Sequence, residues 1–114
     1  MKDSEKQKML RGELYNAYDK ELLNERLRVQ DVCRAYNQTS HRDHEKRMQI
    51  LANLLGSIGE RCLIEPFFRC DYGYNIFIGE DFYSNFDLII LDVCKVRIGN
   101  NCLIGPRVTI TTAG

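Results

Sequence analysis

A six-residue repeat is the feature of this sequence that most limits its fold. From Ile64 the chain divides into successive groups of six, and an apolar residue opens five groups in a row. These opening residues are Ile64, Cys70, Ile76, Phe82 and Leu88. Cys94-Lys95 then interrupts the register, which resumes at Val96 and continues through Cys102 and Val108. A short fixed period of this kind is typical of solenoid proteins.

An ordinary antiparallel sheet is the alternative, because alternating strands also place apolar residues at the first and third positions. That alternative does not explain the turn-forming residues. Between Asp71 and Gly105, only Val93 to Ile98 forms a long run without Gly, Pro, Asn or Asp. Three six-residue units can close one triangular coil of about 18 residues, and coils stack about 4.8 Å apart by parallel pairing. The opening side chains would then fill the interior.

The first half of the chain has helical spacing instead. Ser4 and Gln7 predict a capping box at the start of a short helix. Apolar residues from Leu22 to Tyr36 recur mostly at intervals of three and four, and a third helix begins near Arg42, with Gly56 expected as its C-terminal cap. We therefore expect a mainly β protein with an N-terminal α-helical segment. The expected units are a helical domain over residues 1–58 and the first coils of a β-helix over 59–114.

Composition excludes several classes of partner and site. Sixteen Lys and Arg residues balance sixteen Asp and Glu residues, so the net charge of zero gives no field that attracts nucleic acid or an anionic membrane. No apolar run approaches the roughly 20 residues that cross a bilayer, and the N-terminus carries both signs of charge, so a cytoplasmic location is expected. The five cysteines include no C-x-x-C pair and are expected to be reduced thiols.

Both halves of the chain resemble one family. The segments KMLRGELY (8–15), NERLR (24–28) and AYNQT (35–39), together with residues 69–114, resemble the maltose and galactoside O-acetyltransferases, a subgroup of the hexapeptide-repeat acyltransferases. The motifs DYGYNIFIG, Asn85-Phe86-Asp87 and LDVC carry the match in the second half. The resemblance implies a left-handed parallel β-helix in a homotrimer, with active sites between subunits. It also implies transfer of an acetyl group from acetyl-CoA to a hydroxyl of maltose, glucose or a galactoside. No metal is expected.

In that family a histidine takes the proton from the attacking hydroxyl, in a motif that continues from Thr-Ala and one small residue into His-Pro. Here the sequence reads Thr112-Ala113-Gly114 and stops. We therefore expect a β-helix that is incomplete at its C-terminal end, in a fragment or truncated product that carries the acceptor-side half without the base and is inactive alone. The alternative is a non-catalytic oligomerising module derived from such an enzyme. The residues that contact coenzyme A are not assigned.

Histidine chemistry elsewhere in the chain is not expected. The two histidines, His41 and His44, precede the third helix and match no position of the family's base. A metal site built on them would lack further ligands. A zinc-dependent hexapeptide-repeat enzyme would need histidines between residues 62 and 114, and that part of the sequence has none.

Two candidate site residues follow from the resemblance within the repeats. Asn85 matches a position beside the catalytic base and is expected to support catalysis; its alternative role is a corner asparagine that tolerates left-handed backbone. Asp71 matches a position that contacts the sugar, because a carboxylate accepts charge-assisted hydrogen bonds from hydroxyls. An ordinary turn aspartate is the alternative for Asp71.

Three more residues are expected to bind the acceptor. Asp92 interrupts the apolar residues 88–93 and resembles a second acceptor-side carboxylate, with a hydrogen-bonded corner as the alternative. Tyr83 would either stack on the sugar or pack against a neighbouring subunit. Arg26 matches a position from which the helical segment reaches over the acceptor. An ion pair along the helix is a weak alternative for Arg26, since no acidic residue lies three or four positions away.

Overall fold

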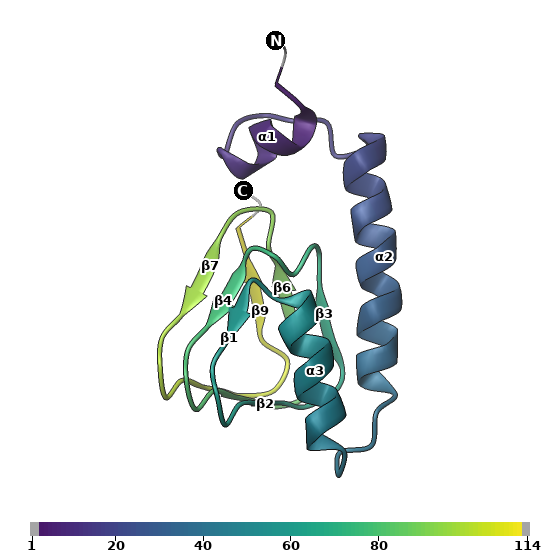
Figure 1. The fold of residues 1–114 in the computed structure, drawn as a ribbon. Coiled ribbons are helices and arrows are strands. Elements are labelled where there is room, and N and C mark those ends of the chain that lie inside the picture. Colours follow the sequence, from purple (N-terminus) through teal and green to yellow (C-terminus); the bar gives the residue numbers. More distant parts are fainter. Residues whose placement is uncertain (1–2, 113–114) are drawn as a thin grey trace.

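The computed structural model describes residues 3–112, in which three helices precede nine short strands (Figure 1). The helices are α1 Glu5–Leu10, α2 Lys20–Asn37 and α3 His44–Leu54. The strands of the first two coils are β1 Ser57–Ile58, β2 Leu63–Ile64, β3 Phe68–Cys70, β4 Ile76–Ile78, β5 Tyr83–Ser84 and β6 Leu88–Leu91. The third coil contains β7 Val96–Ile98, β8 Leu103–Ile104 and β9 Thr109–Thr111.

The strands form three parallel sheets, which are the faces of a triangular solenoid. The first face has the order β1-β4-β7, the second β2-β5-β8 and the third β3-β6-β9. Ser57 pairs with Phe77, and Leu63 pairs with Tyr83, so neighbouring strands are offset by 20 residues. The same offset holds between the second and third coils, where Tyr83 pairs with Leu103. The expectation of about 18 residues per coil is therefore wrong.

The additional residues of each coil lie in one corner, between the third and first faces. We call this the wide corner; it comprises residues 71–75 and 92–95. Cys94-Lys95 belongs to it, as the break in the repeat predicted. The equivalent insertion in the preceding coil was hidden because Cys70 is the second inward residue of β3, whereas Ile76 is the first inward residue of β4. The repeat thus passes from the second inward position of one strand to the first of the next, so the spacing in the sequence stays at six despite the insertion.

The interior of the solenoid is apolar, as the repeat predicted. All five opening residues from Ile64 to Leu88 are buried, and the third-coil residues Ile98, Ile104 and Ile110 pack against them. Helix α3 adds Leu51 and Leu54 to the same core, and α2 lies along the third face (Figure 1). No helix within residues 3–112 is both long and apolar enough to span a bilayer.

The helical segment has the ends that the sequence predicted, with one exception. The Ser4 hydroxyl accepts from the backbone N–H of Gln7, whose side chain accepts from the Ser4 N–H, so the capping box is present. Gly56 is not the cap of α3, because Leu55 occupies that position in extended backbone. The Gly56 N–H instead donates to the Gly73 carbonyl at 3.1 Å. A Cβ at this glycine would lie 2.6 Å from the Tyr74 carbonyl oxygen, so close packing of the chain explains the residue.

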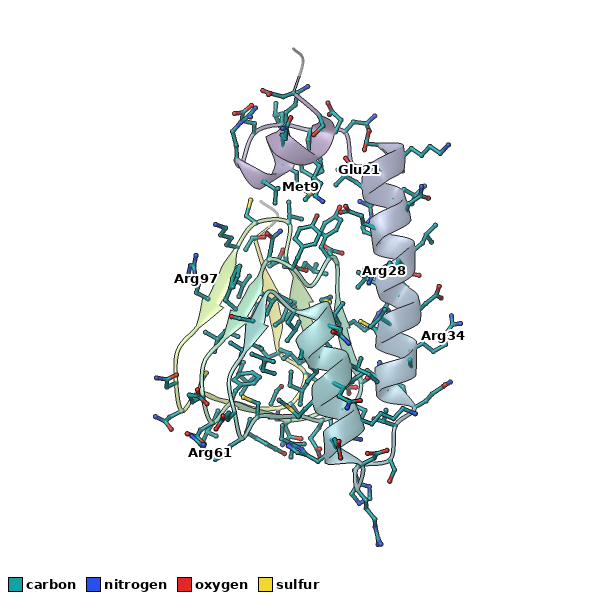
Figure 2. All side chains as sticks on the ribbon, viewed as in Figure 1. Met9, Glu21, Arg28, Arg34, Arg61 and Arg97 are labelled. Atoms are coloured by element: carbon teal, nitrogen blue, oxygen red, sulfur yellow. The ribbon has the colours of Figure 1, made fainter. Side chains whose placement is uncertain are left out.

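The narrow corner between the first and second faces repeats the same backbone in each coil. Arg61, Asp81 and Asn101 occupy equivalent positions 20 residues apart, and each has a positive φ. In Figure 2, Arg61 lies at the bottom of the solenoid, where its Nε donates to Asp81 Oδ1 of the next coil at 2.6 Å. Aspartate and asparagine tolerate left-handed backbone better than most residues, which explains their recurrence here.

Substitution of a corner glycine provides a test of the stacking. We predict that Gly59→Ala lowers the free energy of unfolding by about 1–3 kcal/mol, because the new Cβ would lie 2.6 Å from the Gly79 carbonyl oxygen of the next coil. Gly99→Ala is the matched control, since a Cβ at Gly99 meets nothing within 4 Å. Urea unfolding of both variants measures the difference. Equal stability of the two would contradict the observed stacking of the corner.

Candidate functional site

A groove of about 320 Å³ lies between α2 and the third face. We call it the Asp71 groove. Helix α2 contributes Arg26 and Gln30, which are one helical turn apart. The β-helix contributes the outward side chains of β3 and β6 and the first residue of the wide corner, namely Arg69, Asp71, Ile89 and Leu91, with Cys70 below them.

The Arg26 guanidinium is held in place at the edge of this groove. Its Nη1 donates to the Tyr72 hydroxyl at 2.7 Å, and its Nη2 donates to the Ala17 carbonyl at 2.7 Å. Burial raises the pKa of Asp71, and the positive charge of Arg26 opposes that shift. A carboxylate and an oriented cation therefore border the same groove, and the acceptor-binding role expected of these two residues stays a prediction.

Asp92 has a different position from the one expected of an acceptor ligand. Its side chain is 0% exposed. Oδ1 accepts from the backbone N–H groups of Asp71 (3.1 Å) and Tyr72 (2.9 Å), and Oδ2 accepts from those of Gly73 (2.7 Å) and Asn75 (3.3 Å). Burial raises the pKa of Asp92, while these backbone donors oppose the shift. The carboxylate cannot touch a ligand in this arrangement; it fixes the corner that carries Asp71.

The same corner is also held from outside by the helical segment. The Tyr74 hydroxyl donates to Glu25 Oε1 at 2.7 Å, and Lys6 Nζ lies 2.7 Å from Glu25 Oε2. Burial, together with the hydrogen bond to Glu25, raises the pKa of Tyr74, which keeps the hydroxyl protonated as a donor. Met9 of α1 is fully buried against this part of the solenoid (Figure 2). Contacts from both sides therefore fix the position of Asp71.

Asn85 and Tyr83 lie elsewhere, around the corner between the second and third faces. The Asn85 backbone N–H donates to the Ile104 carbonyl at 2.9 Å, and its side-chain Oδ1 accepts from the Phe86 N–H at 2.8 Å. Tyr83 is half-buried on β5 and pairs with Leu63 and Leu103 in the neighbouring coils.

One copy of the chain does not bring all five candidates together. Asp71 follows β3, whereas Asn85 precedes β6, and these two strands pair in parallel. The two residues therefore lie at opposite ends of the third face, which at about 3.3 Å per residue places them more than about 10 Å apart. Arg26, Asp71 and the buried Asp92 form one group. Asn85 and Tyr83 form a second.

Two hydrogen-bonding side chains of the Asp71 groove, Gln30 and Arg69, were not among the residues expected from the sequence. Gln30 follows Arg26 by four residues, so helical periodicity could have found it. Arg69 stands between the inward residues Phe68 and Cys70, so strand alternation could have placed it on the outer surface. Both histidines are exposed, and no group of three metal-binding side chains occurs within residues 3–112. Ala113 and Gly114, where the family's histidine motif was compared, lie outside the described residues.

Known proteins share the sequence and the fold of this chain. Residues 8–59 match the maltose acetyltransferase hexapeptide capping motif. A putative acetyltransferase of Saccharomyces cerevisiae is 48% identical over 90% of this chain and 53% of its own length. The solved maltose O-acetyltransferase of Clostridium difficile 630 has a TM-score of 0.95 and 46% identity, covering 98% of this chain and 60% of that one. A galactoside acetyltransferase in complex with coenzyme A has a TM-score of 0.90 and 33% identity, covering 99% and 56%.

The parallel three-faced solenoid, its helical cap and these matches place the chain among the hexapeptide-repeat acyltransferases. Within that class it belongs to the maltose and galactoside O-acetyltransferase subgroup, a family of acetyltransferase enzymes. The expected left-handed parallel β-helix with an N-terminal helical segment is thereby confirmed. The chain spans little more than half the length of several of these relatives.

The role of Asp92 can be tested by removing its charge while keeping its shape. We predict that Asp92→Asn lowers the free energy of unfolding by about 2–4 kcal/mol, because the new amide group would face backbone N–H donors instead of accepting from them. Asp87→Asn is the matched control, since Asp87 is exposed and has a positive φ that asparagine tolerates. Thermal and urea unfolding measure both variants. A small effect of Asp92→Asn would show that the corner does not depend on the carboxylate.

Proposed function

We propose that the protein to which this chain belongs transfers an acetyl group from acetyl-CoA to a hydroxyl of a sugar such as maltose, glucose or a galactoside. The observation that carries this proposal is the Asp71 groove, where Asp71 and the oriented Arg26 border one cavity. The family of this chain and the coenzyme A complex of the galactoside acetyltransferase support it. We also propose a cytoplasmic location and no requirement for a metal.

Asp71, Arg26 and Asp92 have different roles in this proposal. Asp71 accepts hydrogen bonds from two neighbouring hydroxyls of the sugar, which fixes the ring relative to the donor. Arg26 donates to acceptor oxygens from the opposite side, with its orientation set by Tyr72. Asp92 acts indirectly, through the backbone of the wide corner. In the family a histidine is the base, and neither His41 nor His44 lines this groove.

We infer that the complete site forms between copies of the chain in a homotrimer. The positions of Asp71 and Asn85 at opposite ends of one face support this, because a single copy cannot place both beside one acceptor. A second copy would bring its corner with Asn85 and Tyr83 toward the Asp71 groove. Exposed apolar side chains near that corner, Phe67, Phe86 and Leu103, support contact with another subunit. The division into a helical domain over 1–58 and coils over 59–114 stays a prediction.

The assignment of Asp71 can be tested in a chain that carries the remaining part of the enzyme. We would join residues 1–114 to the segment of the Clostridium difficile maltose O-acetyltransferase beyond its matched region. This chimera is expected to acetylate maltose, glucose or a galactoside, whereas residues 1–114 alone are expected to be inactive. Asp71→Asn should lower kcat/KM for the sugar by about 10- to 100-fold, the value of a hydrogen bond to a charged group.

Asp31→Asn is the matched control for this experiment, because Asp31 lies exposed on α2 outside the groove. It should leave kcat/KM unchanged. A folded chimera without acetyl transfer to any sugar would overturn the proposed activity and favour the oligomerising module. Full activity of Asp71→Asn would overturn only the assignment of that residue.

The proposed assembly gives a separate prediction. Leu103 is 77% exposed on the second face, and we predict that Leu103→Glu converts trimers into monomers, because an acid would be buried at the contact. Leu14→Glu is the control, since Leu14 is 98% exposed in the segment after α1 and does not lie on the second face. Light scattering with size exclusion measures the mass of each variant. A monomeric unsubstituted chain across the micromolar range would contradict self-association through this surface.

A further inference from the structure

Helix α2 runs antiparallel to β3, and its register places two cysteines side by side. Near the C-terminal end of α2, Asn37 Nδ2 donates to the Phe68 carbonyl at 3.0 Å, and the Phe68 N–H donates to Asn37 Oδ1 at 2.8 Å. Cys33 precedes Asn37 by four residues, a rise of about 6 Å along a helix. Cys70 follows Phe68 by two residues, about 6.6 Å along a strand. The two distances match, so the docking brings Cys33 to Cys70.

The two thiols line one groove, and each affects the acidity of the other. The neighbouring Cys70 thiol is the main cause of the lowered pKa of Cys33, and the nearby charge of Arg69 acts in the same direction. The neighbouring Cys33 thiol, followed by burial, raises the pKa of Cys70. Cys33 lies on the helix beside the cationic lining of the groove, a setting that favours the thiolate, so we assign it as the attacking thiol and Cys70 as the resolving one.

Both thiols border a second groove of about 310 Å³, which we call the Cys33 groove. Cys33 is 5% exposed and Cys70 9%, so this groove is the route by which a reagent reaches them. Its other lining residues are the polar or cationic Gln30, Arg34, Asn37, Gln38 and Arg69, together with the apolar ring of Phe67. Such a lining suits a small ligand that carries carboxylates as well as sulfur.

The other cysteines have no such arrangement. The Cys62 thiol donates to carbonyl oxygens of its own corner and the next, those of Gly59 and Gly79, each at 3.3 Å. Cys94 donates to the Met9 carbonyl at 3.3 Å. Cys102 packs against the interior of the solenoid. Within residues 3–112, Cys33 and Cys70 alone combine a thiol partner with a groove that both border.

We propose that Cys33 and Cys70 form a redox-active dithiol that reacts with small carboxylate-bearing disulfides of the glutathione disulfide class. The Cys33 thiolate attacks one sulfur of the disulfide, forms a mixed disulfide and releases one thiolate, which takes a proton from water. Cys70 then loses its proton to water and attacks the Cys33 sulfur, which releases the second thiolate. The protein gives up two electrons, and the small disulfide becomes two thiols.

The disulfide would join α2 covalently to β3. Gln30, Arg69 and Cys70 line both the Cys33 groove and the Asp71 groove, so the oxidised pair would fix one wall of the proposed acceptor site. Thiol–disulfide exchange uses neither Asp71 nor Arg26. The reaction can therefore be measured without acetyl transfer.

The test uses the 114-residue chain, exposed under native conditions to glutathione disulfide, quenched with acid and mapped by mass spectrometry. We expect a Cys33–Cys70 disulfide in the unsubstituted chain. Cys70→Ser should stop at a mixed disulfide between Cys33 and glutathione, and Cys33→Ser should leave Cys70 unreacted. Cys62→Ser, the control, should form the same disulfide as the unsubstituted chain.

A second measurement distinguishes a native disulfide from damage. The oxidised chain should melt roughly 10 °C above the reduced chain, because the link closes a long loop, and dithiothreitol should reverse the gain. The proposal is overturned if Cys33 reacts no faster than Cys62, if the link maps to another pair, or if oxidation lowers the Tm. The disulfide found by mass spectrometry in the unsubstituted chain decides the outcome even where a serine variant fails to fold.

Discussion

Parallel pairing at a constant offset of 20 residues is the constraint on which the rest of the structure depends. Triangular coils can stack only if each contains the same number of residues, so the two additional residues must recur at the same corner. In the wide corner, several backbone N–H groups point inward, away from any strand partner. Asp92 satisfies four of them with one carboxylate from the next coil. Without such an acceptor, these buried donors would oppose the closed corner.

Helix α2 converts this solenoid into a surface with chemical groups at defined places. Three contacts follow one another along the helix. Asn37 bonds to the backbone of β3, Cys33 lies beside Cys70 at the end of that strand, and Arg26 donates to the Tyr72 hydroxyl in the wide corner. Because both elements are straight and regular, fixing one end of this contact fixes the others. The Asp71 groove is thus a product of helix docking as much as of the β-helix corner.

The sequence predicted most of the fold because the repeat records which side chains face inward. It did not reveal the coil length, since the shift from second to first inward residue between Cys70 and Ile76 concealed one insertion. For the site, family resemblance selected Arg26 and Asp71, which do share a groove. It could not decide whether Asp92 is a ligand-binding or a corner residue, because that depends on which backbone N–H groups of the preceding coil face its carboxylate. The pairing of Cys33 with Cys70 depends on helix docking, which no local pattern contains.

The placement of polar side chains at the two ends of the third face also explains why a site in this fold would form between two subunits. A coil exposes its functional side chains at corners, and the corners of one face are separated by the full length of its strands. Two groups that must act on one small ligand therefore cannot come from both ends of the same face. A neighbouring subunit can bring the opposite corner alongside. The rigid 20-residue register, which keeps Asp71 and Asn85 apart in one chain, would then hold each at a fixed position in the shared site.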